Sequence, residues 1–418
     1  MAGFLEGIRV LDFSRAVAGS YTTVQLGDLG AEIIKIEEVP PEEPDAADPE
    51  HTEITDWITN HWAMNRNKKG ICLNMKKESA RAVFYELVKN SDIVFDNYRP
   101  HVLKNLGIEY ETIKQYNPRI ISCSVSGFGE DGPWKEMPAF DLIVQAMGGS
   151  MSVTGEPGRM PIRWGVPIGD LAAAVFAALG MVSAIVGRGQ TGIGQRLDMS
   201  MLDVQLALHG YRVPRTFGMG MEFGPQPRRS GAAGQVPYGP YKTSDGRWIA
   251  IAGGGVQFWQ PICKAVGRED LLSEPRFETS TKRREQEEEI SRIFEEVFAT
   301  KTADEWEQIL LGVKIPAAKV NTIKEAFEHP QAKARNMLIS FDHPLGQKMK
   351  FAANPIKVPS LADAICYKPA PGLGEHTKEI LTDVLSYKKN RLATLKQEGA
   401  IWWPEKGLTY TRSYERYA

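Results

Sequence analysis

The sequence predicts an α/β protein with a parallel sheet and a second, smaller domain. The first 40 residues read strand, helix, strand, which is the order of a βαβ unit with a right-handed crossover. This alternation continues to about residue 125. A segment dense in Gly and Pro, residues 217–240, then separates it from heavily charged helical segments. At 418 residues the chain is long enough for two or three domains.

The elements of the first part follow from local composition. β-rich runs predict strands, an amphipathic or capped run predicts a helix, and an acidic, Pro-rich stretch at residues 40–51 predicts a surface loop. Gly30 closes the first helix. The predicted strands are 8–13, 31–37, 70–74, 92–95 and 119–125, and the predicted helices are 21–29 and 78–89.

An uncharged apolar run, residues 171–187, directly follows Asp170. The run is shorter than the roughly 20 residues of a membrane span and is rich in Ala and Gly, so we expect the central helix of a large core and no membrane partner. Asp170 falls at or next to the helix N-terminus, where free backbone N–H groups and the dipole favour negative charge. Its position fits an N-cap, a common role of Asp, or a catalytic carboxylate. Position alone leaves both open.

The second part of the chain predicts a small domain and a return to the first. A hairpin is expected at 241–253 with its turn at Asp245-Gly246, followed by charged helices at 281–298 and 302–311. From about His329 mixed strands and helices resume, ending in a helix at 377–397 and an aromatic tail. The expected domains are the N-terminal part of the large α/β domain, the linker, the small domain and the return to the large domain, at 1–216, 217–240, 241–330 and 331–418.

Charge and cysteine content narrow the class of protein. A net charge of −2, from 50 basic and 52 acidic residues, argues against a nucleic-acid partner. The first residues do not read as a signal peptide, so we expect a cytoplasmic location. Four dispersed cysteines are typical of reduced thiols and form no metal-binding pair: Cys72, Cys123, Cys263 and Cys366.

Several motifs fail in context. Residues 187–192 match G-x-G-x-x-G but follow a helix, where glycines terminate it in a left-handed cap. The turn after Phe13 holds a single glycine, Gly19, so we expect no dinucleotide cofactor. There is no P-loop, no G-x-S-x-G elbow and no metal-ligand spacing among the seven histidines.

After these exclusions, the candidates for catalysis and ligand binding are Asp170, a Gly-rich segment at 230–234, and the basic residues Arg66, Lys68, Lys69 and Arg99. A carboxylate serves as a covalent nucleophile when bound substrate aligns an electrophile against it. A glycine-rich segment that closes over the intermediate would exclude water.

At these residues the chain resembles the class III CoA-transferases, the family of formyl-CoA transferase and L-carnitine CoA-transferase. The resemblance spans roughly residues 5–385, and many motifs occur in one order. They include GIRVLDFSRAVAG, LGAEIIKIE, NRNKKGICLNMK, DNYRPHVLKNLGI, NPRIISCSVSGFGEDGP, PAFDLIVQAMGG, IGDLAAA and GIGQRLDMSMLD.

The resemblance implies that Asp170 is the nucleophile and passes through an acyl anhydride and an aspartyl-CoA thioester. CoA thioesters are then substrates, no cofactor is permanently bound, and the partners are an acyl-CoA (succinyl-CoA as a candidate donor) and a carboxylic acid. It also implies a large doubly wound, Rossmann-like domain built from both chain ends, a smaller α+β domain, and an interlocked homodimer. A heteromer with a related subunit is the alternative assembly.

The family's CoA-contacting positions carry over to Val17, Ala18, Leu73, Asn74, Lys76, Asn97, Tyr98, Arg99, Ala139, Phe140, Asp141 and Met201. The mobile active-site loop corresponds to Gly231, Ala232, Ala233 and Gly234, two of whose positions are Ala instead of Gly. Glu38 stands where formyl-CoA transferase binds CoA through Arg, so other cations are needed, with Arg66, Lys69 and Arg99 as candidates. Val17 replaces a Gln beside that enzyme's active site, which disfavours oxalate and formate as acceptors.

Two alternative functions share this fold. α-Methylacyl-CoA racemases carry a proton-transferring His where this chain has Phe140, which cannot exchange a proton, so transfer is favoured. A non-catalytic subunit of a hetero-oligomeric transferase is disfavoured because Asp170 is present. Four residues are candidates for an apolar acceptor pocket suited to an aryl or branched acid: Phe140, Met147, Trp164 and Tyr238.

Overall fold

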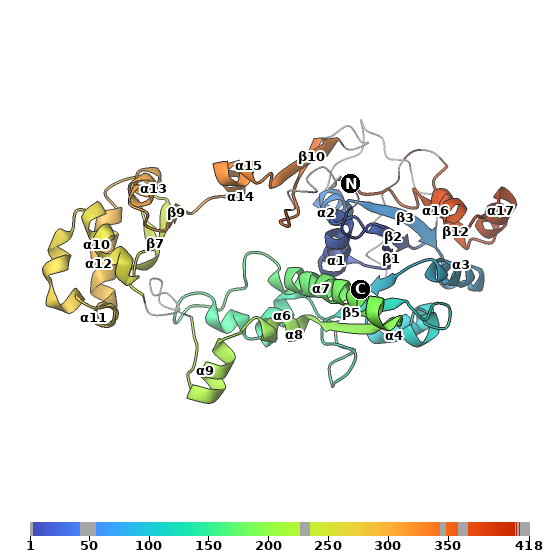
Figure 1. Cartoon of the computed structure of the whole chain (residues 1–418), viewed down its shortest axis with the longest axis horizontal. Coiled ribbons are helices and arrows are strands. Elements are labelled where there is room, and N and C mark those ends of the chain that lie inside the picture. The colour runs from blue at the N-terminus through green and yellow to red at the C-terminus, as the bar shows by residue number, and fades with distance from the viewer. Residues whose placement is uncertain are drawn as a thin grey trace. The chain divides into compact units, whose positions relative to one another are not determined.

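The computed structural model describes residues 3–41, 56–225, 235–342, 348–357, 367–405, 407 and 409. The chain divides into two compact units (Figure 1). The large unit comprises Met1–Ser150, Trp164–Gly210 and Asn336–Ala418, and the small unit comprises Met151–Arg163 and Tyr211–Arg335. These limits differ from the sequence-based boundaries at 216, 240 and 330.

A seven-stranded sheet forms the centre of the large unit. Its strands pair in parallel, except that β12 at the edge runs antiparallel to β3. The chain builds β1 to β3 in one direction and β4 to β6 in the other, so the order reverses between β1 and β4. In spatial order the strands are β12 (Ile401–Trp402), β3 (Lys68–Leu73), β2 (Glu32–Glu37), β1 (Arg9–Asp12), β4 (Ile93–Asp96), β5 (Ile121–Ser126) and β6 (Arg196–Ser200). The predicted α/β class with a mostly parallel sheet is confirmed.

Helices bury both faces of this sheet, as a parallel sheet requires. Val10 and Ile33 pack in a core with α1 (Ala16–Asp28) and α7 (Ile168–Thr191). Their neighbours Leu11 and Ile34 point to the other face and pack with α3 (Glu78–Lys89), α16 (Thr377–Asp383) and α17 (Lys389–Gln397). C-terminal elements therefore complete a sheet that N-terminal residues begin, and α16 and β12 lie beside β3 (Figure 1).

The other elements of the large unit are shorter. Helix α3 has the bounds that the sequence predicted, whereas α1 begins five residues before the predicted Tyr21. The remaining elements are α2 (Asp56–Asn65), α4 (Pro100–Leu106), α5 (Tyr110–Ile113), α6 (Asp141–Met147), α8 (Met201–Ala207), β10 (Leu338–Asp342) and β11 (Lys348–Ala352).

The small unit combines a three-stranded antiparallel sheet with helices. The expected hairpin is present with Gly246 in its turn at φ +78°, although its first strand begins at Tyr238. An aromatic core of Tyr241, Trp259, Phe294 and Phe298 fills its interior. Its elements are α9 (Arg212–Met219), β7 (Tyr238–Lys242), β8 (Trp248–Ala252), α10 (Val256–Ala265), α11 (Ser280–Glu285), α12 (Glu287–Phe298), α13 (Ala303–Gly312), β9 (Ala317–Lys319), α14 (Ile323–Glu328) and α15 (Pro330–Ala334).

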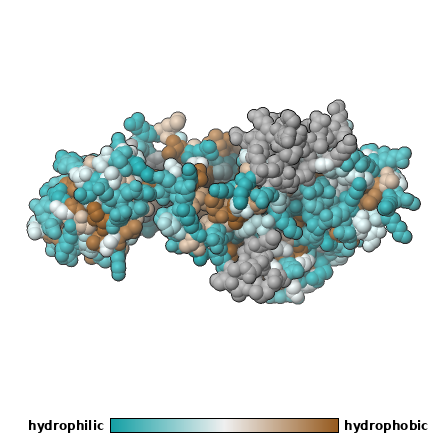
Figure 2. Space-filling model, turned by 90° about the horizontal axis from the view of Figure 1, so that it is seen from above, coloured by the Kyte–Doolittle hydropathy of each residue, from teal (hydrophilic) through white to brown (hydrophobic). Residues whose placement is uncertain are grey.

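Helix α7 has one buried and one exposed face. Among the described residues it is the helix long and apolar enough to cross a membrane, but its buried alanines, such as Ala173 and Ala177, pack with α1 and β5. The opposite face exposes large side chains, including Leu179 at 60% and Val186 at 63%. Figure 2 shows that hydrophobic side chains do reach the surface of the molecule among hydrophilic ones. The helix runs through Gly187 and ends in a left-handed glycine at Gly192, φ +74°.

Candidate active site

Asp170 is the third residue of α7, not its N-cap. Pro167 takes the N-cap position, so the capping interpretation of Asp170 is wrong. The carboxylate is partly buried, and among the described residues no group donates a hydrogen bond to it. Burial, followed by the charge of Asp141, raises the pKa of Asp170 to about 6. A carboxylate with a raised pKa and no structural partner is a candidate for catalysis.

Asp141 supplies the contact at the α7 N-terminus that Asp170 does not make. Asp141 begins α6, and its Oδ1 accepts a hydrogen bond from the Gly169 N–H at 2.7 Å. Its Oδ2 accepts one from Gln145 Nε2 at 2.7 Å, and Gln145 Oε1 in turn accepts from the Trp164 N–H at 3.0 Å. Gln145 is fully buried. This chain of bonds holds the start of α7, and with it the backbone of Asp170.

Gly169 allows this close approach of α6 to α7. A Cβ at position 169 would lie 2.7 Å from Val144 Cγ2 and 2.9 Å from Asp141 Oδ1. Any other residue would therefore push the two helices apart or displace the Asp141 carboxylate.

Several predicted positions come together around this end of α7. Ala18 and Met201 belong to the same core cluster as Ala173 of α7, and Ala139 packs against that cluster. Phe140 is the N-cap residue of α6, and its side chain is 75% exposed. The structure thus joins segments more than 100 residues apart in sequence in the core that α7 covers.

Asn97 fixes the turn after β1 through the backbone of Arg15. Asn97 Oδ1 accepts from the Arg15 N–H at 2.8 Å, and its Nδ2 donates to the Arg15 carbonyl at 2.9 Å. Gly19 permits this, because a Cβ there would lie 2.6 Å from Asn97 Cγ. Val17 and Ala18 occupy the first turn of α1, where their N–H groups have no partner within the helix. Those N–H groups form a place for an anion or a carbonyl oxygen.

A cleft of about 740 Å³ lies at the carboxyl ends of β1 to β3, near the point where the strand order reverses. Open α/β sheets bind ligands at this edge. Four predicted CoA positions line the cleft, namely Leu73, Asn74, Lys76 and Tyr98. Glu38 also lines the cleft, at the position where formyl-CoA transferase binds CoA through Arg. Three further lining residues are ones that the resemblance did not point to, namely Arg15, Glu37 and Lys77.

Glu37 is an unusual member of the cleft wall. Its Oε2 is buried and has no hydrogen-bond partner among the described residues. Burial raises the pKa of Glu37, although Lys35 and Lys68 act in the opposite direction.

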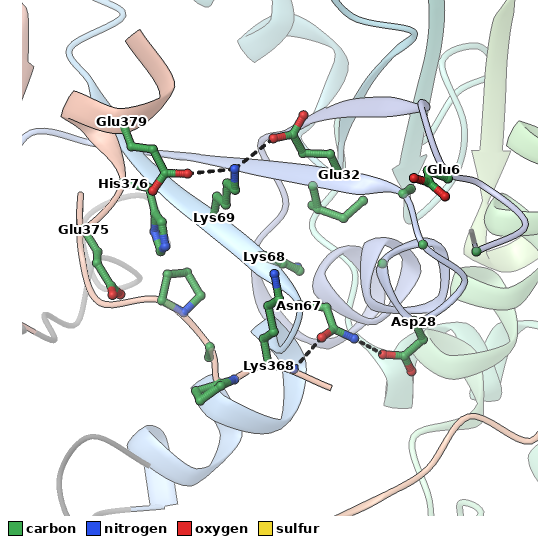
Figure 3. Close-up of a pocket in the computed structure, with 18 residues that line it drawn as sticks. Glu6, Asp28, Glu32, Asn67, Lys68, Lys69, Lys368, Glu375, His376 and Glu379 are labelled. Atoms are coloured by element: carbon green, nitrogen blue, oxygen red, sulfur yellow. Dashed lines mark hydrogen bonds and ion pairs between the residues drawn. The ribbon is translucent and has the colours of Figure 1, made fainter. Parts of the chain in front are cut away.

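Two of the basic candidates for CoA phosphates are engaged elsewhere. Arg66 makes two hydrogen bonds to the Asp28 carboxylate, at 2.7 and 3.1 Å. Lys69 bridges Glu32 at 3.1 Å and Glu379 at 2.8 Å (Figure 3). Arg99 is exposed at the N-cap of α4.

The cavity that holds Lys69 is not the candidate active site. It measures about 760 Å³ and lies at the amino ends of β2 and β3 (Figure 3). Lys68 lines it, but its ammonium group reaches the buried Asp12 carboxylate at 3.0 Å. Burial lowers the pKa of Lys68 to about 8 against the opposing effect of Asp12. Both lysines, Lys68 and Lys69, are therefore paired with carboxylates.

Other predicted residues fall outside this arrangement. The loop Gly231, Ala232, Ala233 and Gly234 lies outside the described residues. Of the proposed acceptor-pocket residues, Phe140, Met147 and Trp164 are exposed on the large unit, and Tyr238 belongs to the small unit. Sequence reasoning missed Gln145 and Gly169, whose only signal is that they lie within the motifs PAFDLIVQAMGG and IGDLAAA.

Most of the chain matches the model of a known family. Residues 5–377 match the model of CoA-transferase family III. The chain belongs to this family. It is an enzyme that transfers CoA, as the sequence predicted.

Named relatives support the same activity over nearly full length. The transferase is 32% identical to succinyl-CoA:glutarate CoA-transferase of Mus musculus, covering 95% of this chain and 90% of the mouse protein. It is 32% identical to succinyl-CoA–D-citramalate CoA-transferase of Chloroflexus aurantiacus, covering 95% and 98%. The crystal structure of a CAIB/BAIF family protein from Brucella suis superposes with a TM-score of 0.79 at 29% identity, covering 92% of this chain and all of that one.

Proposed function

We propose that this transferase moves CoA through covalent intermediates on Asp170. The observation that carries the proposal is a partly buried carboxylate at the start of α7 that no described group hydrogen-bonds. With a pKa of about 6 it is ionised at neutral pH, yet it is more basic than an ordinary Asp. Both properties suit a nucleophile.

The reaction balances in four steps. A carboxylate oxygen of Asp170 attacks the donor thioester, which releases CoA thiolate and leaves a mixed anhydride. The thiolate attacks the aspartyl carbonyl, which releases the donor acid with one oxygen from Asp170 and forms an aspartyl-CoA thioester. The acceptor carboxylate then displaces CoA to give a second anhydride. CoA thiolate finally attacks the acceptor carbonyl and leaves one acceptor oxygen on Asp170.

Two parts of the large unit serve this reaction, the start of α7 and the cleft at the carboxyl ends of β1 to β3. Asp141, Gln145 and Gly169 fix the start of α7 and so fix the backbone position from which Asp170 extends. The cleft lined by Leu73, Asn74, Lys76 and Tyr98 receives the nucleotide end of CoA, with the α1 N-terminus beside it.

We further propose succinyl-CoA as donor and, as acceptor, a dicarboxylic acid with a main chain of four to five carbons. This rests on relatives named for succinyl-CoA with glutarate or D-citramalate. A panel of acids with succinyl-CoA, including glutarate, a methyl-branched dicarboxylate and an aryl-substituted succinate, tests it. Highest kcat/KM for the aryl acid would instead favour the apolar acceptor that the sequence predicted from Phe140, Met147, Trp164 and Tyr238.

A homodimer is the assembly that we propose, in a cytoplasmic setting. Exposed apolar residues on α6 to α8 form a face that monomeric proteins rarely leave uncovered: Leu142, Ile143, Val175, Phe176, Leu179, Val186 and Leu206. The buried free thiols Cys72, Cys123 and Cys263 suit a reducing compartment. Sedimentation at micromolar concentration should give a dimer that Leu179→Arg weakens, and a monomer would refute this assembly.

Isotope transfer tests the covalent mechanism directly. An acceptor acid labelled with ¹⁸O in its carboxylate should place label in the peptide that contains Asp170, measured by mass spectrometry after turnover. Asp170→Asn should abolish CoA transfer. Asp203→Asn is the matched control, because Asp203 is also the third residue of its helix, α8, but is exposed. Unlabelled Asp170 after turnover, or an active Asp170→Asn enzyme, would exclude the covalent route.

A further inference from the structure

Arg15 projects into the nucleotide cleft in a defined position. Its guanidinium carbon lies 5.1 Å from the centre of the Tyr98 ring, and its Nη2 lies 3.2 Å from Glu38 Oε1. All three residues line the cleft of about 740 Å³. The Arg15 side chain is 21% exposed and that of Glu38 is 41% exposed.

Three features prepare Arg15 to bind a ligand anion. Asn97 holds both backbone polar groups of Arg15, so the root of the side chain is fixed. The Tyr98 ring supports the face of the guanidinium, which leaves its N–H groups at the edge of the plane. A planar guanidinium matches the oxygens of a phosphate with two parallel hydrogen bonds.

The neighbouring cation Lys77 is less well placed for this task. Lys77 also lines the cleft, but its ammonium donates a hydrogen bond to the Glu398 carbonyl at the rim. Arg15 instead has an exchangeable partner, because Glu38 is a partly exposed carboxylate whose ion pair contributes little stability. An incoming phosphate can replace one anion with another without leaving the guanidinium unpaired.

We propose that Arg15 binds a phosphate group of CoA and that Glu38 competes with that phosphate for the guanidinium. The proposal rests on placing the CoA nucleotide in this cleft, as the proposed function does. Glu38 repels the incoming phosphate and re-forms its ion pair when the phosphate leaves. The transferase therefore holds CoA less tightly than its cations alone would allow, and release of the product thioester is favoured.

The test is a double-mutant cycle read by CoA binding, using isothermal titration calorimetry of the full chain. Arg15→Gln should weaken CoA binding about 10- to 100-fold, the worth of a charge-assisted hydrogen bond. Glu38→Gln should tighten it about two- to fivefold. In the Arg15→Gln background, Glu38→Gln should tighten binding less than it does in the wild type, because the competition for the guanidinium is gone and only the repulsion of the phosphate is relieved.

Controls separate this exchange from general charge and from misfolding. Arg15→Lys keeps the charge but loses the planar fork, so it should bind CoA with intermediate affinity. Arg9 and Glu32 form an ion pair of similar exposure outside this cleft, 26% and 31%, so Arg9→Gln should leave CoA binding within twofold of wild type. Titration with 3′-dephospho-CoA identifies the phosphate: loss of discrimination in Arg15→Gln assigns the 3′-phosphate, and retained discrimination assigns the diphosphate.

Two results would overturn the proposal. One is Arg15→Gln binding CoA within twofold of wild type, and the other is Glu38→Gln binding it more weakly. Neither depends on turnover. An active Asp170→Asn enzyme with the expected binding cycle would overturn the covalent mechanism and leave the role of Arg15 intact.

Discussion

Replacing Asp170 with Asn should make the protein more stable at alkaline pH while abolishing its activity. Burial and Asp141 raise the pKa of Asp170 from 3.8 to about 6 in the folded state. The native protein thus binds this proton more tightly than the unfolded chain does. Between about pH 4 and pH 6 the free energy of unfolding contributed by this group falls as pH rises, and it stays low above pH 6.

The size of the effect follows from the shift of about two pKa units, which corresponds to about 3 kcal/mol at most. Asn has no charge to desolvate, so Asp170→Asn should raise the free energy of unfolding by up to about 3 kcal/mol at pH 8. At pH 4, where Asp170 is protonated, the gain should nearly vanish. The active wild-type enzyme should lose kcat/KM as pH falls below about 6, because the nucleophile becomes protonated.

Urea denaturation at pH 4 and pH 8, followed by far-UV circular dichroism, measures the difference between the variants. Asp203→Asn is the matched control, since Asp203 also lies in the first turn of a helix and is exposed. The free energy of unfolding of Asp203→Asn should be lower than that of the wild type by up to about 1 kcal/mol at pH 8, because Asn interacts more weakly with the helix dipole. A stability gain of Asp170→Asn that is equal at both pH values, or a loss at pH 8, would refute the reasoning.

Three further substitutions test the supports of the site. Gly169→Ala should lower the free energy of unfolding, measured by thermal denaturation, by about 1–3 kcal/mol and lower kcat at least tenfold, because the added Cβ meets Val144 and Asp141. The control is Gly187→Ala, whose added Cβ meets no atom within 4 Å and which should be neutral or stabilising. Gln145→Leu should lower kcat/KM, because Asp141 and the Trp164 N–H lose a buried hydrogen-bond partner. It should also lower the free energy of unfolding, measured by urea denaturation, by about 1–3 kcal/mol. Unchanged kcat/KM would contradict the role of Gln145. Lys68→Met should lower the free energy of unfolding by about 3–5 kcal/mol, because the buried Asp12 carboxylate loses its ion-pair partner. The double variant Lys68→Met, Asp12→Asn should recover part of this loss. Equal stability of the single and the double variant would refute the pairing.

Elements with strong local signals could be predicted from the sequence. Strands β1 to β5 and helix α3 follow from β-rich runs and from 3.6-residue periodicity, within a few residues. The edge strand β12 covers only Ile401–Trp402 and exists because β3 is beside it in space, which no local pattern encodes. The early start of α1 is similar, because it depends on Asn97 holding the Arg15 backbone from 82 residues away.

The residues of the candidate site likewise include some that the sequence could predict and others that it could not. Asp170 could be found because it stands alone before an apolar helix and within family motifs. Its partners could not, because the bond from Gly169 to Asp141 joins residues 28 apart and leaves no periodic trace. The cations near the strands were equally ambiguous, since only folding shows that Arg66 pairs with Asp28 whereas Arg15 faces the cleft.

Because C-terminal elements complete the sheet beside β3, the large unit cannot finish folding until the last segment has been synthesised. The face of the sheet that carries α3 gains Ile380, Leu395 and Trp403 only from the last segment, and β3 forms its outer ladder with Ile401. While the ribosome is still adding that segment, β3 remains an open edge with an uncovered apolar face. The small unit, mostly one continuous stretch from Tyr211 to Arg335, needs no such wait. During synthesis the large unit is therefore more exposed to aggregation than the small unit.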